Sequence, residues 1–193
     1  MKKSIIGAAF LCAFTASAET EYLKIELNDG TVSTVAVGDI REMTFITEEA
    51  SPAEELAGTY TGTNTVVVGG QFTYTAETSV VITANEDGTV NFTWQEYMLG
   101  GTVMGDLTLG TCTISNIAYD EDKGGFYRDY SNDGLTQHLK AEQGGTATMD
   151  KDYALGATST ILIEKTDAGI RVSNPFKLGA MPFPITASYE GKK

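Results

Sequence analysis

The stretch QFTYTAETSVVITANEDGTVNFTW, residues 71–94, decides the fold. Large side chains occupy alternate positions on both sides of its centre: Phe72, Tyr74, Val80, Ile82, Val90, Phe92 and Trp94. Successive side chains of an extended strand point to opposite faces, so these residues share one face and the intervening Thr, Ser and Glu residues share the other. The central NEDG, residues 85–88, consists of turn-forming residues. The stretch therefore predicts two antiparallel strands, 71–84 and 88–98, that share an apolar face.

The same alternation continues through most of the chain, and Gly, Asp and Asn mark the breaks. Further strands are predicted over residues 58–68, 106–118, 125–130, 133–139, 144–149, 157–165, 169–175 and 184–190. A short helix is predicted over 151–156. Long, evenly spaced strands joined by hairpin turns favour a meander over a Greek key. We therefore predict an all-β fold, an up-and-down antiparallel barrel of about eight to ten strands.

The interior of this barrel is either filled or hollow. An eight-stranded barrel is just wide enough to be packed with side chains or to hold one small ligand. Two apolar segments, MLGGTVMGD (98–106) and PFKLGAMPFPI (175–185), either cover a pocket at one barrel mouth or cap the barrel end as additional core. If a ligand is bound, the candidate contact residues are Tyr60, Phe72, Tyr74, Phe92, Trp94, Met98 and Met104.

The N-terminus has the pattern of a secretion signal. Residues 2–3 are both Lys, residues 5–14 are apolar, and Ala-Ser-Ala at 16–18 fits a signal peptidase site. We expect residues 1–18 to be a signal peptide, because the apolar run is too short for a membrane span. Cys12 lies inside that run, so no lipid anchor is expected. The protein is thus expected to cross the inner membrane and act in the periplasm, outside the cell or at its surface.

Three further parts are predicted. Residues 19–50 form an N-terminal β-hairpin segment, because the strand-like runs of YLKIELNDGTVSTVAV (22–37) flank the turn residues Asn-Asp-Gly. Another strand is expected over 38–46. Residues 51–57 are acidic, Ala-rich and contain a Pro, so they are expected to be a linker, with one helical turn as an option inside it. The barrel domain then covers 58–193.

The charge and the reactive residues exclude several functions. The chain has 26 acidic and 13 basic residues and a formal net charge of −13, so nucleic acid is not an expected partner. His138 is the single histidine, which excludes multi-histidine metal sites. After signal cleavage Cys112 is the single cysteine, and its alternating surroundings indicate a buried structural thiol. Residues 129–134 partly resemble a calcium loop, but Lys140 stands where a Glu ligand belongs, so a hairpin turn is expected.

The sequence also has no nucleophile elbow of the Gly-x-Ser-x-Gly type, no phosphate-binding glycine loop and no dinucleotide fingerprint. We therefore expect no catalytic residues, no metal site and no cofactor.

Three segments resemble the calycin-like β-barrel domain of secreted Bacteroidetes proteins. They are GTYTG (58–62), ITANEDGTVNFTW (82–94) and MGDLTLGTCTISNI (104–117), and the resemblance covers roughly residues 56–190. The segment LKIELNDGTVSTVAVGDIREMTFI (23–46) is similar to a short β-segment that often follows the signal peptide in secreted proteins of that phylum.

Calycins include the lipocalins and fatty-acid-binding proteins, whose barrels enclose apolar molecules. Lipocalins open with Gly-x-Trp, and an Arg near the last strand packs over that Trp. Here Tyr60 stands in place of the Trp, and 184–190 contains no Arg, while Arg171 lies one strand earlier. The resemblance thus implies the fold and no established activity.

Two functions remain open at this point. The first is a secreted, non-enzymatic barrel that binds a small apolar or amphipathic ligand. The second is a filled barrel that acts as an interaction module of the envelope or cell surface. Its partner would be an envelope protein or a glycan, bound by a loop face or by strand pairing with residues 22–46.

Overall fold

The structure is a computed structural model of the chain and describes residues 21–27, 29–44 and 50–193. The predicted signal peptide, residues 1–18, lies outside the described residues. The chain divides into two compact units, Met1–Glu48 and Glu49–Lys193.

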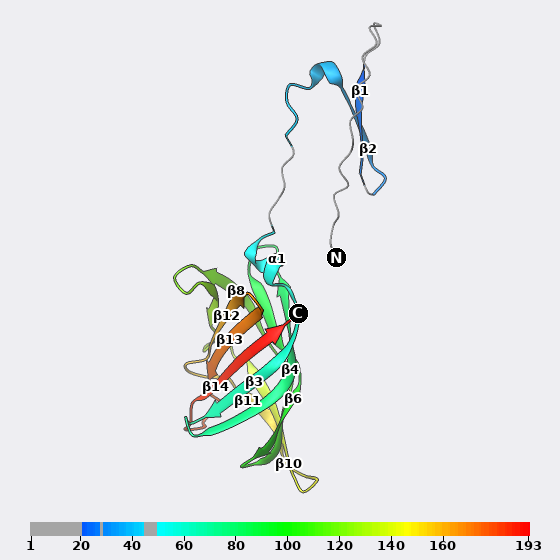
Figure 1. The fold of residues 1–193 in the computed structure, drawn as a ribbon. Helices are drawn as coiled ribbons and strands as arrows, with labels where there is room; N and C mark the ends of the chain where they lie inside the picture. Colours follow the sequence, from blue (N-terminus) through cyan, green and yellow to red (C-terminus); the bar gives the residue numbers. More distant parts are fainter. Residues whose placement is uncertain (1–20, 28, 45–49) are drawn as a thin grey trace. The chain divides into compact units, whose positions relative to one another are not determined.

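The first unit contains a β-hairpin. Strands β1 (Tyr22–Glu26) and β2 (Val32–Ala36) pair antiparallel, and a 3₁₀ turn, η1 (Val37–Asp39), follows them (Figure 1). This hairpin agrees with the pattern of 22–37. The further strand expected over 38–46 is absent from residues 38–44, whose backbone turns at η1 instead; residues 45 and 46 lie outside the described part.

The second unit contains one short helix and twelve strands. They are α1 (Pro52–Leu56), β3 (Gly58–Val68), β4 (Phe72–Ala84), β5 (Val90–Trp94), β6 (Tyr97–Thr102), β7 (Gly105–Leu109), β8 (Cys112–Asp120), β9 (Gly125–Asp129), β10 (Thr136–Gln143), β11 (Thr146–Ala154), β12 (Thr160–Thr166), β13 (Gly169–Phe176) and β14 (Ile185–Lys192).

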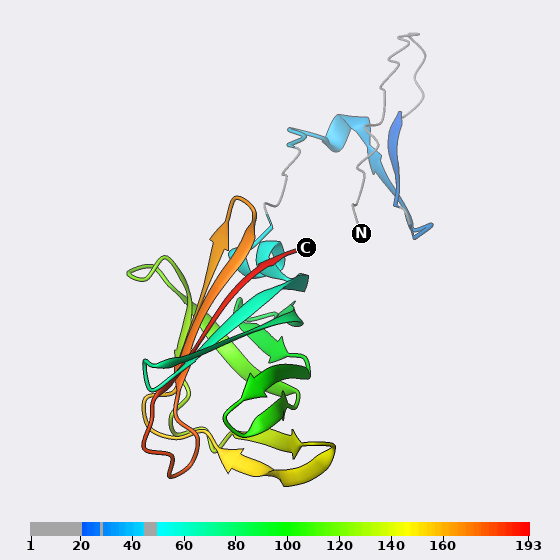
Figure 2. The same ribbon diagram turned by 60° about the horizontal axis from the view of Figure 1, so that its bottom comes forward.

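Eight of these strands close an antiparallel barrel in the order β12-β13-β14-β3-β4-β5-β8-β9. Neighbours in the barrel follow one another along the chain, and β14 returns to pair with β3 from Ile185↔Val68 to Lys192↔Thr61 (Figures 1 and 2). The predicted fold class, an up-and-down all-β barrel, is confirmed.

Two hairpins are inserted into this meander, β6–β7 between β5 and β8, and β10–β11 between β9 and β12. They pair with each other through β7 and β10 and form a second sheet, β11-β10-β7-β6, seen in green and yellow in Figure 2. Both insertions leave the barrel at the end where β3 turns into β4, which we call the mouth. The opposite end, with the turns at 85–89, 121–124 and 167–168, we call the base.

The insertions correct several sequence predictions. The strand predicted over 88–98 is divided between β5 and β6, and that over 106–118 between β7 and β8. The helix predicted over 151–156 is wrong, because β11 runs on to Ala154 and pairs with β10 up to Thr136↔Ala154. Ladder pairing satisfies the backbone there and overrides the local helical preference. The expected hairpin turn at 129–134 is a turn, but β9 and β10 do not pair across it.

Large side chains fill the barrel interior. Val80, Ile82 and Phe92 are at most 1 % exposed, so the face predicted from residues 71–94 does point inward. Trp94 packs edge-on between Phe92 and Tyr189, with ring centroids 5.0 and 5.6 Å apart. Such pairs add aromatic attraction to the burial of apolar area. The interior is thus a core in its central part rather than a ligand chamber.

The base is closed by α1. Its N-terminus is a capping box in which Glu54 N donates to Ser51 Oγ and Ser51 N donates to Glu54 Oε2. Ala53 and Leu56 are buried in the core, and the Tyr60 hydroxyl donates to Leu56 O over 2.7 Å. Residues 51–57, expected to be a linker, therefore form a capped helix that belongs to the barrel unit.

Candidate functional site

An apolar pocket of about 100 Å³ lies at the mouth. Apart from Thr102 its lining side chains are apolar or aromatic. They come from the barrel, the second sheet and the mouth loops: Val66, Val68, Phe72, Tyr74, Leu99, Thr102, Val103, Met104, Leu107, Leu109, Leu139, Phe176, Leu178, Met181 and Ile185. Small-molecule sites are apolar concavities of this kind, but they ordinarily measure roughly 300–1,000 Å³, so this pocket has room for only part of a larger ligand.

The fold brings the two apolar segments, 98–106 and 175–185, to this one mouth, as one of the sequence interpretations required. The first is not a loop but the β6–β7 hairpin, whose tip is held by Thr102 Oγ1, which donates to Gly105 O and accepts from Met104 N. Gly105 has φ +91°, and a side chain there would meet Glu142 O at 2.1 Å. The tip is therefore held close to β10, and Val103 and Met104 line the pocket.

Several large apolar side chains at the mouth remain in contact with solvent. Phe72 is 47 % exposed, Val103 is 73 % exposed and Phe183 is 57 % exposed. Phe183 lies over the β3–β4 turn, where its ring is 3.3 Å from the position of a Cβ on Gly69. Exposed apolar groups around an apolar pocket are typical of a surface that contacts a ligand or a partner.

The structure separates the seven candidate contact residues. Phe72, Tyr74 and Met104 line the mouth pocket. Trp94 lies deeper and lines a second, inner cavity, whereas Phe92 is part of the filled core.

The other two candidates lie elsewhere. Tyr60 is buried at the base, and Met98 is 55 % exposed and does not line the pocket. Sequence reasoning missed the pocket residues Val66, Leu107, Leu139 and Phe176. The sequence shows the alternating pattern along their strands. It does not show that the apolar faces of these strands meet at one pocket, because that depends on how the second sheet pairs.

The inner cavity has a volume of about 10 Å³, enough for one water-sized group. It shares two lining residues, Leu109 and Phe176, with the mouth pocket. Its other lining side chains include polar ones: Trp94, Tyr97, Cys112, Tyr130, Gln137 and Asn174. The mouth pocket thus ends at a polar layer inside the barrel.

Hydrogen bonds organise part of this layer around Asn174. Its Oδ1 accepts from Trp94 Nε1 at 3.3 Å, and its Nδ2 donates to Tyr130 Oη at 2.6 Å and to Thr160 O at 2.7 Å. Burial raises the pKa of the Tyr97 and Tyr130 hydroxyls far above 10, so both are neutral. Burial also raises the pKa of Cys112 to about 11, as expected for a structural thiol.

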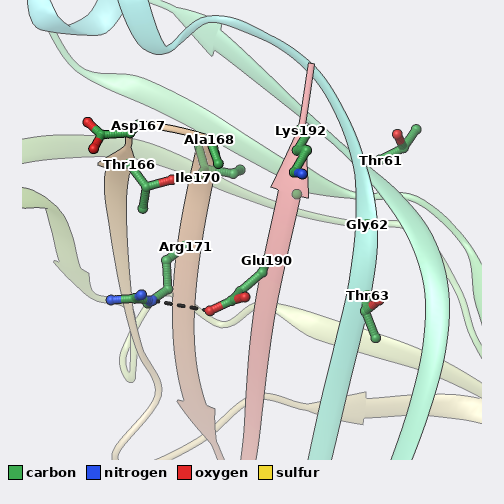
Figure 3. Close-up of a pocket in the computed structure, with 11 residues that line it drawn as sticks. Thr61, Gly62, Thr63, Thr166, Asp167, Ala168, Ile170, Arg171, Glu190 and Lys192 are labelled. Carbon is green, nitrogen blue, oxygen red and sulfur yellow. Dashed lines mark hydrogen bonds and ion pairs between the residues drawn. The ribbon is translucent and has the colours of Figure 1, made fainter.

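A larger hollow of about 600 Å³, whose lining mixes apolar, hydroxyl and charged groups, lies over β3, β13 and β14 (Figure 3). Arg171 and Glu190 point out from neighbouring strands and form an ion pair of 3.4 Å. Gly62 lies opposite Gly191 in the β3–β14 ladder, and a Cβ on Gly62 would meet Glu190 O at 2.0 Å. Gly62 and Gly191 permit this close strand contact and have no side chains to fill the hollow beside it. The charges of Arg171 and Glu190 in its wall neutralise each other.

His138 and Asp133 lie outside the mouth pocket and the inner cavity. His138 is on β10, with Nδ1 2.8 Å from Asp152 Oδ1 and Nε2 3.2 Å from Asp150 Oδ1 on the exposed face of the hairpin. Asp133, in the partial calcium pattern, pairs with Arg128 at 2.6 Å. Within residues 21–27, 29–44 and 50–193, no group of three or more His, Cys, Asp or Glu residues is arranged to hold a metal ion. In the same residues, no helix has the length and hydrophobicity needed to cross a membrane.

A basic side chain lies over Tyr60, although 184–190 has no Arg. Lys193 Nζ is 5.4 Å from the Tyr60 ring centroid and donates to Glu55 O at 2.9 Å. Gly58, φ +155°, leaves room for it, because a Cβ there would meet Lys193 Cε at 2.7 Å. The chain thus closes its base with Lys and Tyr where lipocalins use Arg and Trp.

Comparison with known proteins agrees with this architecture. The family described as "Calycin-like beta-barrel domain" matches residues 56–192. A crystal structure of a "putative outer membrane protein" from Bacteroides fragilis NCTC 9343 is similar with a TM-score of 0.50 and 21% sequence identity, over 88% of this chain. The chain spans 65% of the length of that protein, and at this identity the likeness concerns the fold alone. A search of curated proteins finds no match.

Proposed function

The chain belongs to the calycin-like β-barrel domain family, and from that premise we propose that it is a non-enzymatic binding protein for a small apolar or amphipathic ligand. The observation that carries this proposal is the mouth pocket, whose lining is apolar except for Thr102. Transfer of apolar ligand surface from water into such a lining is favourable by about 25 cal/mol per Å². Phe72, Tyr74 and Met104 are the predicted contact residues that we retain.

The volume of the pocket limits the size of the enclosed group. An apolar cavity of about 150 Å³ holds benzene, or roughly 25 Å³ per carbon atom. By this measure the mouth pocket, at about 100 Å³, encloses roughly four carbon atoms. A longer ligand would lie with its remaining carbons against the exposed side chains of Phe72, Val103 and Phe183. The ligand is thus a short chain, a small ring or one end of a larger molecule.

The absence of enzymatic activity is part of this proposal. General acid–base or nucleophilic catalysis needs a reactive group within hydrogen-bonding reach of the substrate. His138 lies between two carboxylates on the outer face of β10–β11 and is not among the residues that line either cavity. The Cys112 thiol reaches the inner cavity, but its raised pKa keeps it protonated and unreactive at neutral pH.

We further propose that the protein acts outside the cytoplasm, in the periplasm or at the cell surface. Support comes from the signal pattern of residues 1–18 and from the fold likeness to a Bacteroides protein whose printed name is that of an outer membrane protein. N-terminal sequencing of protein secreted by its host should find Glu19 as the first residue. An acylated Cys12 would contradict this cleavage.

Binding is tested with the single tryptophan, Trp94, which lines the inner cavity. Short alkanes and alcohols should change its fluorescence with saturation, and native mass spectrometry should detect their one-to-one complexes. Leu139→Phe, which narrows the pocket and leaves Trp94 as the single tryptophan, should abolish binding, whereas the exposed variant Met98→Leu should bind normally. Absence of binding for every apolar probe tested would refute the ligand proposal.

The second function, an interaction module, is favoured by one observation on the first unit. In β1–β2, Leu23 lies opposite Val35, and Ile25 is next on the same face. Ile25 and Val35 are both exposed. A two-stranded hairpin of this kind is marginal alone and has free edges for strand addition. A photo-crosslinker at Ser33 should capture one defined envelope protein or glycan, and Ile25→Lys with Val35→Lys should prevent the capture.

A further inference from the structure

One buried polar side chain in the barrel has no protein hydrogen-bond partner. Asn64 of β3 points inward between Gly62 and Val66 and is 0 % exposed. Among residues 21–27, 29–44 and 50–193, Asn64 alone combines buried side-chain polar atoms with the lack of any partner, at both Oδ1 and Nδ2. The comparable Asn174 of β13 makes three hydrogen bonds.

An unpaired buried amide lowers stability, because it loses hydrogen bonds to water without regaining them in the protein. Native proteins contain few such groups, and each requires an explanation. One explanation is a binding site, where polar groups are kept available for a ligand at a cost in stability.

Asn64 is not among the residues that line the inner cavity, but it lies next to one of them, Tyr97. Tyr97 lines that cavity, and the Asn64 amide is near enough to the Tyr97 hydroxyl to oppose the rise of its pKa, although no hydrogen bond of good geometry forms. The inner cavity in turn adjoins the mouth pocket at Leu109 and Phe176. An apolar pocket, a narrow neck and a polar end thus follow one another from the mouth inward.

The polar end is uncharged. Among the described residues that line the two cavities, none is an acid, Lys, Arg or His. A carboxylate or ammonium group bound there would lose its hydration without gaining an opposite charge. A hydroxyl or carbonyl oxygen has the size of the inner cavity and can exchange a hydrogen bond with the Tyr97 hydroxyl, which belongs to the lining.

We propose that the ligand of the mouth pocket is an uncharged amphiphile, whose hydroxyl or carbonyl oxygen occupies the inner cavity and whose apolar part fills the mouth pocket. This inference rests on the proposed ligand-binding function and adds the chemical class of the ligand. Leu109 and Phe176 form the neck between the two parts, and a change of their rotamers admits the oxygen. Tyr97 selects an oxygen over a methyl group at the inner end, and the Asn64 amide behind it positions the Tyr97 hydroxyl.

The experiment compares hexan-1-ol, hexane and hexanoate at pH 7, with Trp94 fluorescence as the readout for the full chain. Tyr97→Phe removes only the hydroxyl, and Asn64→Val removes the amide. Both should weaken hexan-1-ol binding about fivefold or more, as expected for an oxygen left without a partner. In both variants the dissociation constant for hexane should stay within about twofold of the wild-type value, since the apolar pocket is intact. Tyr119→Phe, an exposed tyrosine of β8, is the matched control and should bind all probes like the wild type.

The outcomes separate the two proposals. If hexane and hexan-1-ol both fail to bind the wild type, the ligand-binding function itself is refuted. If both bind and neither variant weakens hexan-1-ol selectively, the function stands and the inner polar site is refuted. Tighter binding of hexanoate than of hexan-1-ol would refute the proposal that the ligand is uncharged. Circular dichroism of each variant checks that the barrel is folded.

Discussion

Replacement of Asn64 by Val is expected to stabilise the barrel. Asn64 is fully buried, and neither side-chain polar atom has a protein partner. An unpaired buried polar group costs about 1–3 kcal/mol, which Val does not incur. Val is smaller than Leu and suits a strand, so it limits overpacking at this position. The free energy of unfolding should therefore rise by about 1–3 kcal/mol.

The matched control is Asn174→Val. Asn174 has the same residue type, is 3 % exposed and lies on the inner face of β13. Its loss leaves Trp94 Nε1 and the Tyr130 hydroxyl without their partner. This variant should lose about 1–3 kcal/mol or more, so two equally buried asparagines are expected to give opposite signs.

Thermal unfolding followed by circular dichroism and urea unfolding followed by Trp94 fluorescence measure both variants. For a domain of this size, 1 kcal/mol shifts Tm by about 2–4 °C, so Asn64→Val should raise Tm by about 2–12 °C. The urea m-value should stay constant, which shows that the folded state is comparably compact. A fall in Tm for Asn64→Val at constant m would show that the amide is satisfied in the folded protein and would refute the reasoning.

Three other measurements check the fold. Leu56→Ala removes the side chain that closes the base, and calorimetry should show a loss of about 2–5 kcal/mol. Gly62→Ala places a Cβ 2.0 Å from Glu190 O, so urea unfolding should show a loss of about 1–3 kcal/mol, where an unchanged midpoint would mean that the strands separate freely. The third concerns alkaline pH: burial raises the pKa of Cys112 from 9.0 to about 11 and that of Tyr189 from 10.0 to about 12. The unfolded chain releases these two protons at lower pH than the folded chain, so the protonated groups favour the folded state. Their contribution to the free energy of unfolding is fully present below pH 9 and is lost as the pH rises from 9 to 12. The midpoint of urea unfolding should therefore fall over this pH range, and it should fall by less in Cys112→Ala.

The barrel was predictable because its signals are local. Residues 58–68 and 71–84 alternate over their whole length, and the turns between strands consist of Gly, Asn and Asp. These patterns determine which face of each strand is buried and which strands are neighbours in a meander. The base was less predictable, since Tyr60 was expected to contact a ligand and residues 51–57 to be a linker, whereas the Tyr60 hydroxyl donates to Leu56 O of α1.

The second sheet was not predictable by the same means. Its central pairing joins Leu109 of β7 to Leu139 of β10, which are far apart in the sequence, and no local turn signal links them. For the same reason the walls of the mouth pocket that come from β7 and β10 were missed. Asn64 did leave a signal, because it interrupts the apolar inner face that Tyr60 and Val66 share. A polar residue on a buried face is informative, but its lack of a partner is visible only in three dimensions.

The filled interior explains why the candidate site lies at the mouth. Phe92, Trp94 and Tyr189 fill the centre of the barrel, so the apolar pocket lies above them at the mouth. At that level the barrel wall alone would leave an open rim. The inserted hairpins extend it, with Leu107 and Leu139 as an additional wall opposite Val66 and Val68. In the proposed site the inserted sheet therefore supplies Leu107 and Leu139 to the apolar wall, and Tyr97 of β6 supplies the hydroxyl at the inner end.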